Sequence, residues 1–103
     1  MNKYQIFISQ RAFSDITQCV LFVNNVSSQA AKELYYEIMA AIQALSSFPN
    51  KYPEIQDLKI GDNKYRKMPV HQGRYMVVYR VEVNTVIISD IIDSRKNVAW
   101  FNL

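Results

Sequence analysis

The side chains best suited to chemistry on a phosphate lie in the C-terminal part of the chain. Residues 64–103 hold seven of the twelve Lys and Arg residues but only three of the nine Asp and Glu residues. Lysine and arginine side chains of this kind can stabilise negative charge on a phosphate. The arginines cannot act as a base at neutral pH, because the pKa of a guanidinium is too high. This charge distribution favours an encounter with nucleic acid or an acidic protein, and the alternative is a solvated basic face with no partner.

The other reactive residue types predict no second site. His71 is the only histidine and falls in a predicted turn, so we expect an exposed loop residue rather than a general base. Cys19 lies on the apolar face of a predicted helix, where a buried and unreactive thiol is expected. Asp90 and Asp93 lack the further carboxylates that a magnesium nuclease needs. We therefore expect no metal and no organic cofactor.

Two helices follow a short N-terminal strand in the predicted order of elements. Residues 3–8 alternate as a strand, and Ser9 is a suitable N-cap for a helix over about residues 10–25. Apolar residues at three- and four-residue spacing predict a second helix at 28–47, which stops before Pro49. Joined by so few residues, the two helices should form an antiparallel hairpin.

Three strands are predicted after a loop at 49–63, at about residues 64–70, 74–82 and 85–93. The resulting order βααβββ predicts an α+β domain, with the helical hairpin packed on one face of a small antiparallel sheet and the other face left available. The expected core is Ile6, Ile16, Val20, Leu34, Ile38, Leu45, Val77 and Tyr79.

Strand alternation also predicts an interaction surface on this sheet. Alternate residues of a strand point to one face, so we expect Arg66 and Met68 to share a face with Met76 and Val78. If the strand at 74–82 is regular, the same surface also carries Arg74 and Arg80. Such a surface would have an apolar centre and basic rims. In the alternative interpretation, the two methionines belong to the core and the arginines only solubilise the edges.

Size and composition are those of one small domain over residues 1–103. Its apolar runs are too short for a transmembrane helix, and the first residues lack the apolar segment of a signal peptide. A single cysteine fits a reducing compartment. These features predict a cytoplasmic protein with no membrane partner.

Several segments in sequence order resemble the RelE/ParE superfamily of toxins from bacterial type II toxin–antitoxin pairs. The similar segments are Ser9-x-Arg11-Ala12 before the first helix, Leu45 and Phe48-Pro49 after the second, Tyr65-Arg66-Lys67-Met68-Pro69-Val70, Gly73-Arg74-Tyr75-Met76-Val77-Val78-Tyr79-Arg80-Val81, and Asp93-Ser94-Arg95-Lys96. The resemblance runs over nearly the whole chain and keeps the order of elements. It implies a small toxin that a co-expressed antitoxin holds inactive.

Two activities occur among the proteins that this chain resembles. RelE-like toxins cut mRNA on the ribosome, whereas ParE-like toxins bind DNA gyrase and block it. The RelE-like set would match Arg66 and Arg95 here, but methionine occupies two of its cationic positions, Met68 and Met76, and Phe101 stands near a functional tyrosine. A thioether cannot stabilise charge on a scissile phosphate, so the resemblance is closer to ParE-like sequences and favours a protein that is not an enzyme.

The sequence therefore predicts a toxin that binds a large target, most plausibly gyrase. The alternatives are a metal-independent mRNA endonuclease that uses Arg66, Lys67, Arg74 and Arg95, and an inactive homologue that survives as a binding protein. Expected partners are an antitoxin and either gyrase or the ribosome with its mRNA, in a homodimer or a toxin–antitoxin hetero-oligomer. The residues expected to contact the target or the antitoxin are Arg66, Met68, Arg74, Met76, Arg80, Arg95, Lys96 and Trp100.

Overall fold

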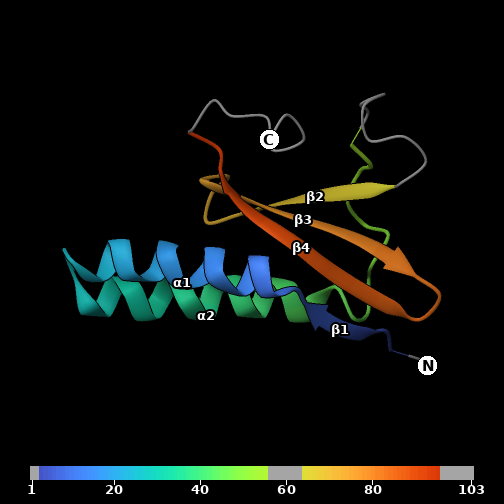
Figure 1. The fold of residues 1–103 in the computed structure, drawn as a ribbon, viewed down its shortest axis with the longest axis horizontal. Helices are drawn as coiled ribbons and strands as arrows, with labels where there is room; N and C mark the ends of the chain where they lie inside the picture. The colour runs from blue at the N-terminus through green and yellow to red at the C-terminus, as the bar shows by residue number, and fades with distance from the viewer. Residues whose placement is uncertain (1–2, 56–63, 96–103) are drawn as a thin grey trace.

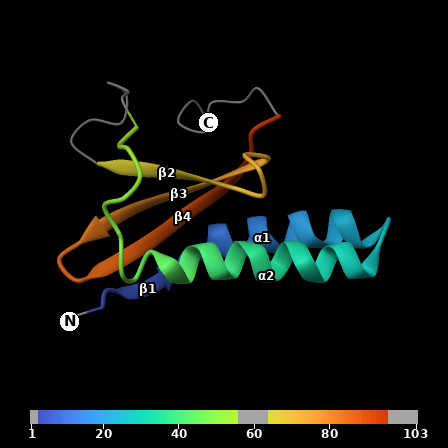
Figure 2. The same cartoon turned by 180° about the vertical axis from the view of Figure 1, so that it is seen from behind.

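A computed structural model describes residues 3–55 and 64–95. The elements in chain order are β1 (Gln5–Ile8), α1 (Gln10–Asn24), α2 (Ser28–Ala44), β2 (Tyr65–Val70), β3 (Tyr75–Glu82) and β4 (Thr85–Asp93). The two helices lie side by side as an antiparallel hairpin, and the sheet crosses one side of it (Figures 1 and 2). The predicted α+β order is confirmed.

Serine side chains begin both helices, and Ser9 was predicted to do so. Ser9 Oγ accepts the Ala12 N–H at 3.0 Å, and Ser27 Oγ accepts the Ala30 N–H at 3.1 Å. Each bond satisfies an amide that has no partner within the helix. Neither helix, nor any other in the described part of the chain, is long and apolar enough to cross a bilayer.

The sheet has the strand order β1-β4-β3-β2 and is mixed. The strands β2, β3 and β4 pair antiparallel as predicted, whereas β1 pairs parallel with β4, from Gln5 opposite Thr85 to Ile8 opposite Ile88. A fully antiparallel sheet was therefore the wrong expectation for its first strand. Parallel neighbours need a long crossover connection, and here the helical hairpin and the strands after it supply the connection.

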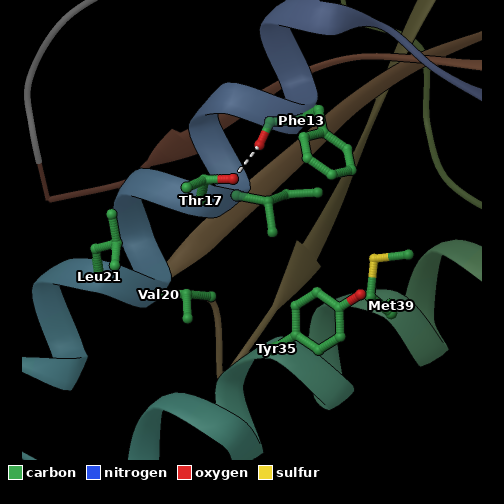
Figure 3. Close-up of a pocket in the computed structure, with 7 residues that line it drawn as sticks. Phe13, Thr17, Val20, Leu21, Tyr35 and Met39 are labelled. Carbon is green, nitrogen blue, oxygen red and sulfur yellow. Dashed lines mark hydrogen bonds between the residues drawn. The ribbon is translucent and has the colours of Figure 1, made fainter.

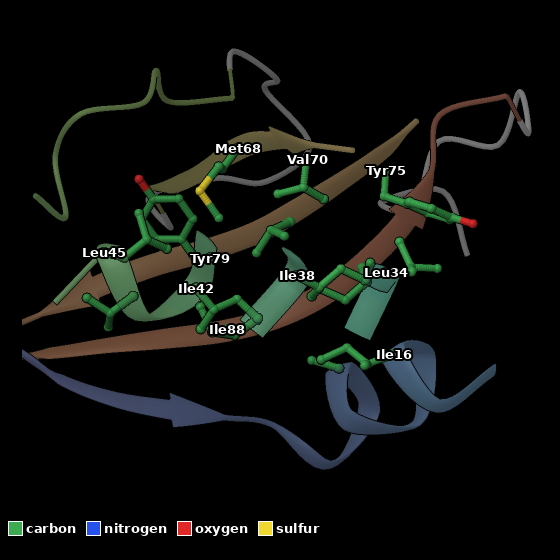
Figure 4. Packing of buried hydrophobic residues seen from close by; sticks show 14 residues of the cluster. Ile16, Leu34, Ile38, Ile42, Leu45, Met68, Val70, Tyr75, Tyr79 and Ile88 are labelled. Atoms are coloured by element: carbon green, nitrogen blue, oxygen red, sulfur yellow. The ribbon is translucent and has the colours of Figure 1, made fainter. Parts of the chain in front are cut away.

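The core lies between the helical hairpin and the sheet. Ile38 and Ile42 from α2 lie in one cluster with Tyr79 of β3 and Ile88 of β4 (Figure 4). Of the eight predicted core residues, six are buried, while Ile6 and Val20 are half-buried and pack against the cluster. The Tyr79 hydroxyl donates to the Pro49 carbonyl at 2.8 Å, so this buried polar atom is satisfied.

Candidate functional site

The register of β2 against β3 divides the predicted interaction surface between two faces of the sheet. Met68 lies opposite Val77 and is buried in the core, whereas Met76 lies opposite Pro69. Arg66 lies opposite Tyr79 and so belongs to the helix-facing side with Met68. The prediction that Arg66 and Met68 share a face with Met76 and Val78 was therefore wrong, because directly opposed residues point to the same side.

Arg66 holds the segment that follows α2. Its Nη1 donates to the carbonyl of Tyr52 at 2.5 Å and to that of Asn50 at 3.4 Å, and its Nη2 lies 3.4 Å from a Glu54 carboxylate oxygen. Glu54 also forms an isolated β-bridge with Arg66. These contacts give the side chain a structural role at the edge of the sheet.

Arg95 lies at the other end of the sheet. Its Nε and Nη2 donate to the two oxygens of Asp93 at 3.2 and 3.0 Å, and this pairing holds the pKa of Asp93 below its usual value. Tyr75 lies opposite Asp93, and Tyr79 opposite Arg66. Arg66 and Arg95 are therefore at least four residues apart along the strands, or roughly 13 Å.

Arg74 lies beside Arg95, in the loop between β2 and β3. Ser94 fixes the two segments together, because its hydroxyl donates to the Arg74 carbonyl at 2.8 Å and its N–H donates to the same oxygen at 2.9 Å. The Arg74 guanidinium lies 5.8 Å from the centre of the buried Tyr75 ring. The charge of Arg74 also lowers the pKa of Asp93, after the larger effects of Arg95.

The other predicted site residues do not join one cluster. Arg80 pairs with Glu82 two residues along the same strand, and Lys67 is exposed opposite Val78. Lys96 and Trp100 lie outside the described residues, as does Phe101. The sheet end therefore brings together Arg74 and Arg95, and separates both from Arg66.

His71 is exposed in the β2–β3 loop, as predicted, but it is not isolated. Its Nδ1 lies 2.9 Å from a Glu37 carboxylate oxygen on α2, and its ring stacks on Tyr75 with centroids 6.1 Å apart. The histidine thus ties the loop to the helical hairpin. No three His, Cys, Asp or Glu side chains group as metal ligands within residues 3–55 and 64–95.

A carboxylate cluster joins α1 to β4. Arg11 Nε lies 2.8 Å from the buried Asp90, and Asp15 accepts the Ile91 N–H at 3.1 Å where β1 no longer covers the edge of β4. Burial raises the pKa of Asp15, and the nearby charge of Asp90 acts in the same direction. This cluster extends the hydrogen bonding of the sheet edge through α1.

The helical hairpin carries an apolar groove of about 220 Å³ that the sequence analysis missed (Figure 3). Phe13 and Leu21 of α1 and Tyr35 of α2 line it, with exposed fractions of 64%, 58% and 42%. Met39 and the Tyr35 ring reach from α2 toward Phe13. The Thr17 hydroxyl already donates to the Phe13 carbonyl at 3.0 Å, so the groove offers mainly apolar contacts. The sequence carries a signal for this groove, because Phe13, Leu21 and Phe22 lie outside the helical stripe of α1 that packs against the core.

Comparison with known proteins identifies the family and the fold of this chain. Residues 6–98 match the family described as ParE toxin of type II toxin-antitoxin system, parDE. The chain belongs to the ParE toxin family. A solved structure titled "Chromosomal ParDE TA system from P. aeruginosa" is similar, with a TM-score of 0.70 at 13% identity, covering 88% of this chain and 96% of that chain. No curated protein matches the sequence. The predicted resemblance to the RelE/ParE superfamily is thus confirmed, and so is the prediction that the chain is closer to its ParE-like members.

Proposed function

We propose that this ParE-family protein is a cytoplasmic toxin that an antitoxin neutralises, and that it acts by binding DNA gyrase rather than by cleaving RNA. The observation that carries the proposal is the dispersal of the cations. Arg66 is occupied by the 50–54 segment, and it lies roughly 13 Å or more from Arg95 along the strands.

Cleavage of RNA to a cyclic phosphate needs several groups around one phosphate. The 2′-hydroxyl must lose a proton, the phosphate oxygens must be stabilised, and the leaving oxygen must gain a proton. Arg74 and Arg95 can stabilise charge, but a guanidinium cannot exchange the protons at neutral pH. His71 has the right chemistry, but its ring is held beside Glu37 of α2, and no hydrogen bond or ion pair of the described residues joins the ring to Arg74 or Arg95. Met76 stands on the strand where a cation would be needed, and losing one such group typically costs about 100–1000-fold in rate.

The helical hairpin supports an antitoxin as the partner. Its exposed aromatic residues line an apolar groove between two antiparallel helices, and a third, amphipathic helix is the natural occupant of such a groove. Apolar contacts of this kind would hold the complex together, while the basic residues of the sheet would speed encounter with an acidic antitoxin.

Purified protein assayed in parallel on gyrase and on translating ribosomes tests the proposal. We expect inhibition of supercoiling and no codon-dependent mRNA cleavage. The Arg95→Ala variant separates the alternatives, with Arg80→Ala as a control that removes an equal charge from an exposed pair. Robust cleavage that Arg95→Ala abolishes and Arg80→Ala does not would establish the endonuclease instead. Inactivity in both assays would favour the third alternative, an inactive homologue that serves as a binding protein.

A further inference from the structure

Arg74 differs from every other arginine in the protein. All five arginines lie in the described part of the chain, and four of them are paired with a carboxylate: Arg11 with Asp90, Arg66 with Glu54, Arg80 with Glu82 and Arg95 with Asp93. No carboxylate of residues 3–55 or 64–95 pairs with Arg74. Arg74 is thus the one arginine without a carboxylate partner among the described residues, although its charge contributes to the lowered pKa of Asp93.

The surroundings of Arg74 hold the side chain in place without satisfying it. Its backbone carbonyl accepts two bonds from Ser94, and its guanidinium lies against the Tyr75 ring. Its Nε, however, is shielded from solvent and has no hydrogen-bond acceptor. An unsatisfied buried N–H is costly, and a guanidinium is most stable when an oxyanion takes two of its N–H groups.

Resting on the proposed antitoxin partnership, we propose that Arg74 is the docking point for a carboxylate side chain of the antitoxin. The neighbouring ion pair of Arg95 and Asp93 shows the expected geometry, because Asp93 accepts hydrogen bonds from both Nε and Nη2 of Arg95. If the Arg74 side chain turns toward solvent, a carboxylate of the antitoxin could accept hydrogen bonds from its Nε and one Nη in the same way. The charge of Asp93 is already committed to Arg95, so the two arginines together retain a positive charge that attracts the incoming acid.

The pairing of the other arginines favours a carboxylate over a nucleic-acid backbone. A nucleic-acid strand is bound through several successive phosphates, which require a run of free cations. Here the arginines of β2, β3 and the β4 end are each engaged by an internal acid, which leaves no run of free arginines along the sheet. The single unpaired guanidinium of Arg74 can bind one acidic side chain, which is what the proposal requires.

The test is a titration of the ¹⁵N-labelled full-length protein, followed through the Nε–Hε signals of its five arginines. The probes are a capped peptide of alternating glutamate and alanine, the same peptide with glutamine, and a single-stranded RNA oligonucleotide. We expect the Arg74 signal to move saturably with the glutamate peptide only. Arg74→Gln should weaken that binding about tenfold, the size of one charge-assisted contact, and the matched Arg80→Gln should not.

Three results would overturn the inference. The Arg74 signal could move equally with the glutamine peptide, it could stay fixed while another arginine responds, or the RNA could bind more tightly than the glutamate peptide. Gyrase inhibition together with any of these would reject the role of Arg74 and leave the proposed function standing. Carboxylate binding at Arg74 without inhibition of gyrase would support the role of Arg74 and reject the proposed gyrase inhibition.

Discussion

Replacing Arg66 with alanine tests whether this cation serves the fold or a reaction. The change removes one short bond from a charged donor to the Tyr52 carbonyl, a longer bond to the Asn50 carbonyl, and the pair with Glu54. A hydrogen bond to a charged group contributes about 1.5–3 kcal/mol. The Glu54 pair adds little, because the Glu54 side chain is 34% exposed and solvent screens the pair.

We therefore expect Arg66→Ala to lower the free energy of unfolding by about 1.5–3 kcal/mol. For a domain of this size each kcal/mol corresponds to roughly 4–8 °C in Tm, so the loss should be plain in a thermal scan and in urea. The segment 50–54 should also become more exposed to hydrogen exchange, because the Arg66 side chain ties it to β2 together with the backbone bridge at Glu54.

Arg80→Ala is the control, since it deletes an equal charge from an exposed pair with Glu82 and should cost about 0–1 kcal/mol. If Arg66→Ala were as stable as the unmodified protein and yet lost its biological activity, the structural role of Arg66 would be refuted. The charge itself would then be needed at the target.

The remaining predictions concern the core, the groove and the acid cluster. Tyr79→Phe should cost about 1–3 kcal/mol in urea unfolding, because it leaves the buried Pro49 carbonyl without its donor. Ile38→Ala, at a side chain with no exposure, should cost about 2–5 kcal/mol. Phe13→Asp should leave stability nearly unchanged, because the ring is mostly exposed, but should weaken antitoxin binding measured by calorimetry. The pKa of Asp15, followed by NMR, should lie above its usual value, because burial disfavours the charged carboxylate. The folded form then keeps this proton to a higher pH than the unfolded chain, so the contribution of Asp15 to stability is lost as pH rises through the folded pKa. A normal pKa for Asp15 would contradict this reasoning.

Local patterns predicted the elements well, because each was determined by nearby residues. The spacing of apolar residues located α1 and α2, and the serines at 9 and 27 begin them. The alternation of β3 correctly placed Val77 and Tyr79 inside. The parallel pairing of β1 was out of reach, because it depends on where the helical hairpin returns the chain to the sheet.

The faces of β2 were assigned wrongly because of one residue in a loop. A three-residue turn at 71–73 would pair Val70 with Arg74, which brings Arg66 and Met68 onto the face of Met76. The loop actually has four residues and pairs Val70 with Tyr75, and three of the four have positive φ: His71, Gln72 and Gly73. A shift of one residue moves a whole strand's side chains to the other face. Glutamine does not favour such a conformation and histidine favours it only modestly, so the length of this loop could not be predicted from its residues.

The pairing of charges explains why a chain with an excess of positive charge need not be a nucleic-acid-binding protein. In the sequence alone, the excess of positive charge in residues 64–103 indicates a basic surface. In the fold, four of the five serve internal acids, and Arg66 and Arg95 are committed at opposite ends of the sheet. Large apolar side chains also stay exposed on the helical hairpin, among them Phe13, Leu21 and Tyr35. Binding should therefore depend on salt mainly through the rate of association, while substitutions in the groove should change the rate of dissociation.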